Sequence, residues 1–422
     1  MQVVKKNVIP KDWQVLSFKE IQDNNHNYPI GDGDHGNIKP SSYQSEGIPY
    51  IRVADIVEDQ IVTDKLTYIS EQVHQNNPKS HLFPGDIIIA KTGATIGKVA
   101  IIPNWMNSAN TTSSVGKITI DKKKTIPLFV YYYIKSEKFR KMMFRVSDKS
   151  AQGGFNVDNI KKFTIDLPSF PEQQQIVSIL SNVDDTIQKT DQIIEQTQRL
   201  KKGMMQKLLT RGIGHTKFKK TKIGEIPEEW EAKKLGEVSE ITRGKFGHRP
   251  RNDPDYYGGK HPFIQTGDVE NAEGFITEYS QTLNDKGLSV SKYFPSNTIV
   301  ITIAANIGGT AITIFPVCFP DSLIGITSKI MDIRFLEYYL RTQKKYLESV
   351  AHTSAQKNIN YQNLKPLLVA VPPLSEQQQI ASILSNIDTQ IGKEKLHKSN
   401  LKRLKKGLMQ KLLTGQIRVK VP

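Results

Sequence analysis

The residues of this chain that could do chemistry fall short of any catalytic set. Gly93–Val99 resembles a phosphate-binding loop, but it is one residue short, and Val99 stands where such a loop has Ser or Thr. Asp86 with Lys91 hints at a metal-dependent nuclease, which needs clustered carboxylates and a lysine. The corresponding segment later in the chain has Asn297 and no lysine. Neither an Asn/Asp-Pro-Pro-Tyr/Phe motif nor a glycine-rich cofactor loop is present, so we predict a binding protein without its own metal or cofactor.

A second group of residues suits contacts with nucleic acid. Arg and Lys can donate to guanine edges and phosphates, Asn and Gln suit adenine, and Gly lets backbone approach a groove. Such residues gather on expected loops in both halves of the chain, and the densest run is 243–251. The candidates are Arg52, Lys91, Thr92, Gly93, Lys98, Gln152, Gly153 and Asn156 in the first half, and Arg243, Lys245, His248, Arg249, Arg251, Gln265, Thr266, Asn306, Gln356, Lys357 and Asn358 in the second.

The net charge agrees with a polyanionic partner. The chain has 58 Lys and Arg against 42 Asp and Glu, a formal charge of +16 in 422 residues. Such an excess favours nucleic acid or an anionic membrane surface. No apolar run approaches the roughly 18 residues that span a bilayer, so we expect no membrane segment. A single cysteine, Cys318, excludes a disulfide framework, and we expect a reducing, cytoplasmic setting.

These candidate residues belong to a unit that occurs twice. Glu172–Ile176 recurs as Glu376–Ile380, Arg199–Gly203 as Arg403–Gly407 and Met205–Thr210 as Met409–Thr414, always 204 positions apart. Upstream the copies diverge and keep only landmarks, such as Trp13 with Trp230. Each unit is therefore a variable segment followed by a fixed segment, which indicates one shared task and one task that differs.

The fixed segments are predicted to be long amphipathic helices. Apolar residues recur at steps of three and four, close to coiled-coil spacing. Two near-identical helices can bury these stripes against each other. The residues expected to pack in the helix pair are Ile176, Leu180, Val183, Ile187 and Ile194 in the first copy and Ile380, Leu384, Ile387, Ile391 and Leu404 in the second.

The helices could run parallel or antiparallel, and the ends of the chain favour antiparallel. Residues 414–422 match the start of the linker that follows the first helix, and residues 4–13 match its finish. The sequence thus resembles a closed ring cut in one of two equivalent linkers. We expect a pseudo-twofold arrangement with neighbouring termini. A separation above about 30 Å, roughly half the length of such a helix, would contradict it.

The variable segments are predicted to be α+β. Asp86–Ala90 and Asn297–Ile301 are typical of buried strands. Leu128–Val146 and Phe335–Val350 are expected to form amphipathic helices, whose tyrosine pairs at 132–133 and 338–339 suit a core better than base stacking.

The chain resembles the specificity subunit (HsdS) of a type I restriction–modification system. The resemblance rests on two divergent bodies, each followed by a helix that begins with the same motif. In the first copy the motif is Pro168, Glu172-Gln173 and Ile176, and in the second it is Pro372, Glu376-Gln377 and Ile380. The resemblance covers nearly the whole chain and is most specific in the helices. It implies target-recognition domains at 1–171 and 212–375, joined by spacer helices at 172–211 and 376–414, with a tail at 415–422 near the N-terminus.

The resemblance also implies partners. Each target-recognition domain would recognise one half of a bipartite site in double-stranded DNA, and the antiparallel helices would fix the spacer. Two modification subunits would bring S-adenosylmethionine and methylate adenine. Two restriction subunits would bring ATP and Mg²⁺ for translocation and cleavage. No catalytic residue carries over to this chain.

Two other classes stay open at this stage. A DNA methyltransferase or nuclease with unrecognised motifs would act without a partner. A protein–protein scaffold using only the helices would show no sequence-selective DNA binding.

Overall fold

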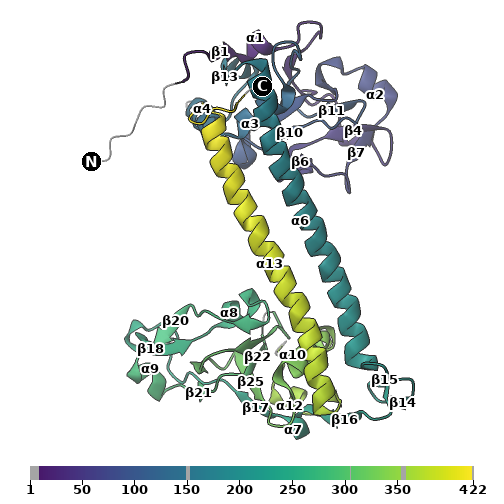
Figure 1. The fold of residues 1–422 in the computed structure, drawn as a ribbon, viewed down its shortest axis with the longest axis vertical. Coiled ribbons are helices and arrows are strands. Elements are labelled where there is room, and N and C mark those ends of the chain that lie inside the picture. Colours follow the sequence, from purple (N-terminus) through teal and green to yellow (C-terminus); the bar gives the residue numbers. More distant parts are fainter. Residues whose placement is uncertain (1–8, 149–152, 305, 353–357, 421–422) are drawn as a thin grey trace. The chain divides into compact units, whose positions relative to one another are not determined.

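The computed structural model describes residues 9–148, 153–304, 306–352 and 358–420. The chain divides into two compact units. Unit 1 holds residues 1–191 and 396–422, and unit 2 holds residues 192–395. Both boundaries fall inside long helices, α6 (Phe170–Arg211) and α13 (Leu374–Leu412). Each unit therefore contains one variable segment, half of α6 and half of α13 (Figure 1).

The body of unit 1 has two main sheets. One has the strand order β10 (Val99–Ile101), β9 (Ile87–Ala90), β12 (Val115–Ile118), β2 (Ile30–Asp32). The other has the order β3 (Tyr43–Gln44), β7 (Thr67–Ile69), β4 (Ile48–Ile51), β11 (Ala109–Thr111), β8 (His81–Leu82). Two small pairs are β1 (Gln14–Ser17) with β13 (Thr164–Leu167) and β5 (Ile56–Val57) with β6 (Gln60–Ile61). The helices before α6 are α1 (Phe18–Ile21), α2 (Glu71–Gln75), α3 (Pro127–Lys135), α4 (Glu137–Ser147) and α5 (Val157–Lys162).

The body of unit 2 repeats this plan. One sheet has the order β17 (Glu240–Arg243), β25 (Leu323–Thr327), β22 (Ile299–Thr302), β23 (Thr310–Thr313), β19 (Phe275–Ile276). The other has the order β20 (Gln281–Leu283), β18 (Tyr257–Phe263), β24 (Val317–Cys318), β21 (Tyr293–Phe294). The small pairs are β14 (Phe218–Thr221) with β15 (Gly224–Pro227) and β16 (Glu231–Lys234) with β26 (Leu368–Val371). The helices are α7 (Leu235–Val238), α8 (Thr266–Asn271), α9 (Asp285–Ser289), α10 (Ile333–Thr342), α11 (Lys344–His352) and α12 (Tyr361–Leu364).

The predicted buried strands are confirmed as β9 and β22, which lie in equivalent places in the two units. The two amphipathic helices, predicted as continuous, are each divided in two. Ser136 separates α3 from α4, and its hydroxyl accepts from the amide of Phe139 as the N-cap of α4 (3.2 Å). An N-cap residue has extended backbone angles, which end the preceding helix. Both tyrosine pairs are buried, as predicted.

The helix halves run antiparallel in each unit. In unit 1, Lys405 pairs with Asp184 and Lys398 with Asp191, so a step of seven residues forward in α6 is a step of seven back in α13. In unit 2, Lys201 of α6 pairs with Asp388 of α13, and the amide of Ile213, just after α6, donates to Glu376 near the start of α13 (2.9 Å). Fold class and antiparallel pairing are thus confirmed within each unit.

The predicted packing residues divide by position along the helices. Those nearest the bodies are fully buried, because they join the body cores as well as the facing helix. These are Ile176, Leu180, Ile380 and Leu384. Farther along, Ile391 is buried and Val183, Ile187, Ile194 and Ile387 are half-buried.

The prediction for Leu404 is wrong, since this side chain is 51% exposed. Its counterpart Leu200 is 58% exposed. The next residue in each copy faces inward instead. The Lys405 amine lies 5.4 Å from the ring centre of Tyr132, and the Lys201 amine lies 5.4 Å from that of Tyr338. Each lysine therefore lies over a buried tyrosine ring, while the leucine before it stays largely exposed.

A tryptophan and a glutamate join each helix start to its body. The indole nitrogen of Trp13 donates to Glu172 (3.3 Å), and that of Trp230 donates to Glu376 (2.9 Å). In unit 1, Arg418 also donates to Glu172 (2.7 Å) and to Asp12 (2.7 Å), so residues from the two ends of the described chain touch. The prediction of neighbouring termini is confirmed for these residues.

Glycine is required where α6 ends. Gly212 follows the last helical residue with φ +63°, the left-handed conformation common at helix C-termini. A Cβ at this position would lie 2.4 Å from Oε1 of Glu376 and 2.7 Å from the Trp230 ring, so a side chain would disturb the joint. Within the part of the chain that the structure describes, no helix combines the length and apolarity needed to cross a membrane.

Candidate nucleic-acid interface

Three arginines of unit 2 meet at one aspartate. Arg243 ends β17 and donates through Nε to the backbone oxygen of Asp321 (2.7 Å). Arg249 donates through Nη2 to the Asp321 carboxylate (3.3 Å), and Arg251 pairs with its other oxygen. Thus three predicted residues from the 243–251 run come together, and Lys245 and His248 lie in the same loop. The side chains of Arg249 and Arg251 are 52% and 46% exposed.

The equivalent position in unit 1 has the opposite charge. Asp32 ends β2 and pairs with Gly116 of β12, as Arg243 pairs with Ile324 of β25. Two residues later, the amide of Asp34 donates to Thr111, as the amide of Lys245 donates to Phe319. Unit 1 therefore has carboxylates where unit 2 has cations.

Lys91, predicted to contact DNA, is placed in the interior of unit 1, so its contact with DNA stays a prediction. Its side chain is buried, and its amine pairs with Asp32, whose other oxygen lies 3.0 Å from His35. Burying a lysine is costly without a counter-charge, and Asp32 supplies it. The nuclease arrangement considered for Asp86 and Lys91 is not formed either, because they lie at opposite ends of β9. Burial raises the pKa of the Asp86 carboxyl, and Lys117 is the lysine that faces it.

Other candidates of unit 1 divide into exposed and structural residues. Thr92 and Gly93 are exposed, and Thr92 forms a β-bridge with Gly154, which brings this loop beside Gly153. Asn156 is exposed and caps α5 by accepting from the amide of Asn159 (3.0 Å). Two cations have intramolecular partners: Lys98 donates to the backbone of Ile56 (3.0 Å), and Arg52 pairs with Asp55 (3.1 Å). Gln152 lies outside the described residues.

The remaining candidates of unit 2 do not join the arginine cluster. Gln265 donates to Gln281 (3.0 Å), and Thr266 begins α8. Asn306 accepts from Lys344 (2.7 Å). Asn358 is half-buried beside Ile359, and Gln356 and Lys357 lie outside the described residues. Among the residues that the structure covers, no group of three or more His, Cys, Asp or Glu side chains could hold a metal ion.

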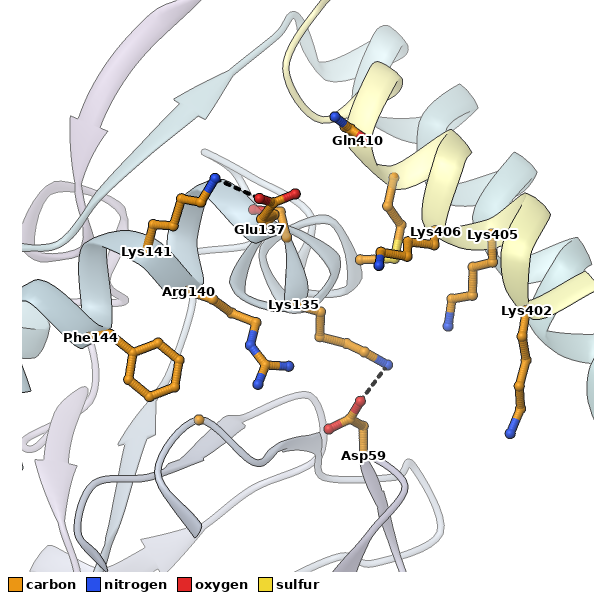
Figure 2. Close-up of a pocket in the computed structure, with 13 residues that line it drawn as sticks. Asp59, Lys135, Glu137, Arg140, Lys141, Phe144, Lys402, Lys405, Lys406 and Gln410 are labelled. Atoms are coloured by element: carbon orange, nitrogen blue, oxygen red, sulfur yellow. Dashed lines mark ion pairs between the residues drawn. The ribbon is translucent and has the colours of Figure 1, made fainter. Parts of the chain in front are cut away.

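Each unit also has a pocket between its helix pair and its body. In unit 1 a pocket of about 560 Å³ lies between the start of α4 and the end of α13 (Figure 2). Lys135 and Lys141 pair with Asp59 and Glu137 there, as the dashed lines show. Arg140 and Lys406 also line it, and neither has an ion-pair partner in the described part of the chain. Burial lowers the pKa of Lys405, and the neighbouring Lys135 lowers it further.

The pocket of unit 2, about 530 Å³, is built from the equivalent helix residues. Lys201, Lys202, Met205 and Gln206 line it where Lys405, Lys406, Met409 and Gln410 line the first pocket. The pocket lining that occurs in both units thus comes from the fixed segments. The loop positions with opposite charges in the two units lie in the variable segments.

Sequence reasoning missed Asp321 and Asp32, the residues that organise the two sites. Each is a lone carboxylate far from its partners, at 70 residues from Arg251 and 59 from Lys91. The signal that could have found them is an alignment of the two units, in which Asp32 and Arg243 occupy equivalent positions.

Comparisons with known proteins agree with this duplicated architecture. The family model described as type I restriction modification DNA specificity domain matches residues 10–199 and 227–403. The putative type I restriction enzyme MjaX specificity subunit of Methanocaldococcus jannaschii is 32% identical over 419 residues, covering 98% of this chain and 95% of the relative. The MjaVIII specificity subunit of the same organism is 29% identical, covering 98% and 94%. The crystal structure of the type I restriction–modification S subunit from M. genitalium shares the fold with TM-score 0.58 at 15% identity, covering 98% of each chain.

Proposed function

The chain belongs to the family of type I restriction–modification DNA specificity domains, and from this we propose that it is the DNA-recognition subunit of such a system. It binds a bipartite, asymmetric site in double-stranded DNA and directs adenine methylation and restriction by partner subunits. One observation carries the proposal: the two units share one fold, but at equivalent loop positions unit 1 has carboxylates and unit 2 has cations. Such an arrangement gives two half-sites of different sequence.

The two bodies, 1–171 and 212–375, are the target-recognition domains. The segments 172–211 and 376–414 are the spacer helices, and the tail 415–422 closes the ring beside the N-terminal segment. With 42 residues, α6 is about 63 Å long at 1.5 Å per residue, which exceeds one DNA turn of about 34–36 Å. The helices can therefore set the separation of two half-sites.

The partners are two modification subunits and two restriction subunits. The paired pockets support two equivalent docking places, because both are lined by the same helix residues. Catalysis belongs to the partners, which supply S-adenosylmethionine, ATP and Mg²⁺. A cytoplasmic location stays a prediction from the sequence.

Reconstitution tests this proposal. The purified chain, with and without its modification subunits, is incubated with labelled S-adenosylmethionine and DNA, and methyl transfer is measured. We expect transfer only with the partners present, at sites that share one bipartite motif. Methyl transfer or cleavage by the chain alone would mean that it is itself the enzyme. A salt-controlled DNA titration of the complex without sequence preference would leave only a scaffold role.

A further inference from the structure

The cluster of Arg243, Arg249 and Arg251 around Asp321 has a more specific chemistry than general DNA affinity. We propose that it is a guanine-recognition site of unit 2, and that Asp321 is the positioning residue that orients the arginines. This inference rests on the proposed function and names the base that one half-site contains.

The hydrogen bonds of the cluster fix the arginines but leave donors free. A guanidinium has five N–H donors in a rigid plane. Arg243 uses Nε on the Asp321 backbone (2.7 Å), which leaves both of its Nη groups for a ligand. Arg249 also donates through Nη1 to the backbone oxygens of Phe246 and His248 (2.7 Å each). The cluster therefore presents planar donors whose positions are set before any ligand arrives.

The loop that carries Arg249 and Arg251 is held in place by aromatic packing. Phe246 is 3% exposed and packs against Tyr257 and Phe263, with ring centres 5.7 and 5.4 Å away. His248 stacks on Tyr256 at 3.9 Å and lies 2.9 Å from Asp253. An anchored loop loses little conformational entropy on binding and discriminates better than a flexible one.

The number of charges also points to a ligand. One arginine is enough to neutralise Asp321, yet three converge on it and Lys245 lies nearby. The guanidinium groups repel one another, and a ligand that supplies further acceptors offsets this repulsion. Guanine does so with O6 and N7 on its major-groove edge, and bidentate Arg–guanine pairing is the commonest specific contact.

The equivalent place in unit 1 excludes the same ligand there. Asp32 replaces Arg243, and Ser113 takes the position of Asp321, since Ser114 and Ser322 accept equivalent backbone hydrogen bonds. Guanine recognition by this cluster is therefore a property of one half-site only.

The test uses the full chain in complex with its modification subunits. Duplexes with each base of the methylated motif replaced in turn are titrated against the wild type, Arg251→Ala, Arg243→Ala and Asp321→Asn. Lys345→Ala is the matched control, because it removes one exposed charge from α11 of the same unit.

We expect guanine in the half-site that responds to the arginine variants. Each arginine variant should lose about 10- to 100-fold discrimination at one guanine, the range of a bidentate contact. Asp321→Asn should lower discrimination at that half-site without weakening non-specific binding, since it removes a negative charge. Lys345→Ala should change neither.

Two results would overturn the inference. One is a responding half-site without guanine. The other is equal weakening for all sequences with a salt slope reduced by about 0.9 per arginine, which marks phosphate contacts. Unchanged melting temperature and an unchanged second half-site exclude misfolding. If no bipartite motif is methylated at all, the proposed function fails instead.

Discussion

Substitution of Asp388 should lower the free energy of unfolding of unit 2 more than most other single substitutions. Its carboxylate accepts from Tyr338 Oη (2.7 Å) and pairs with Lys201 of the facing helix. Asp388→Ala removes both contacts and leaves Lys201, which is 13% exposed, without its counter-charge. A hydrogen bond to a charged group contributes about 1.5–3 kcal/mol and an ordinary one about 1. Because Asp388 is 27% exposed and solvent screens part of this, we expect a loss of about 2–3 kcal/mol.

The loss is measured by thermal unfolding of the purified chain. For a unit of about 200 residues, each kcal/mol lowers the melting temperature by about 2–4 °C, so the expected shift is about 4–12 °C. A double-mutant cycle with Lys201→Met isolates the ion pair, and we expect a coupling of about 1 kcal/mol.

Asp184→Ala repeats the test at the equivalent position in unit 1. Asp184 accepts from Tyr132 Oη (2.8 Å) and pairs with Lys405 in unit 1, so the two variants should behave alike. A loss under about 1 kcal/mol at both positions, or strict additivity with both lysine variants, would refute the view that these contacts hold body and helix together.

Three further predictions concern assembly, specificity and pH. Inserting four residues, about 6 Å of helix, within 176–194 should change the spacer or abolish assembly; a changed half-site sequence would argue against the helices as a ruler. Exchanging 226–370 for the body of a relative should alter one half-site in methylation mapping, and alteration of both would contradict separate recognition domains. The Arg418 hydrogen bond lowers the pKa of Asp12 from its ordinary 3.8, so its stabilising contribution is present at neutral pH and is lost as the pH falls below that value. Asp12→Asn should therefore destabilise the chain at pH 7 and progressively less as the pH falls below 3.8 in urea titrations. An effect that stays constant over the whole acidic range would count against this pairing.

The sequence predicts the fold well where the pattern is local or repeated. The apolar stripes predict α6 and α13. The matching linkers predict neighbouring chain ends, and the structure shows this as a contact between Asp12 and Arg418. Local patterns fail where a long-range partner decides. The sequence pattern places Lys91 on an exposed loop, but in the structure it is buried and pairs with Asp32 of β2. Leu404 satisfies the helical stripe, but Lys405 takes its place against Tyr132.

The candidate site was predictable only in part. The 243–251 run is conspicuous from composition, and the structure brings three of its arginines together. Its organising residue, Asp321, has no sequence motif because the contact depends on the pairing of β17 with β25.

Mapping methylated adenines in DNA modified by the reconstituted complex tests the central claim most directly. Two different half-sites separated by a fixed spacer are the predicted result, with one half responding to unit 1 variants and the other to unit 2 variants. A continuous motif, or two identical half-sites, would contradict the claim that one duplicated scaffold holds two different DNA-recognition surfaces.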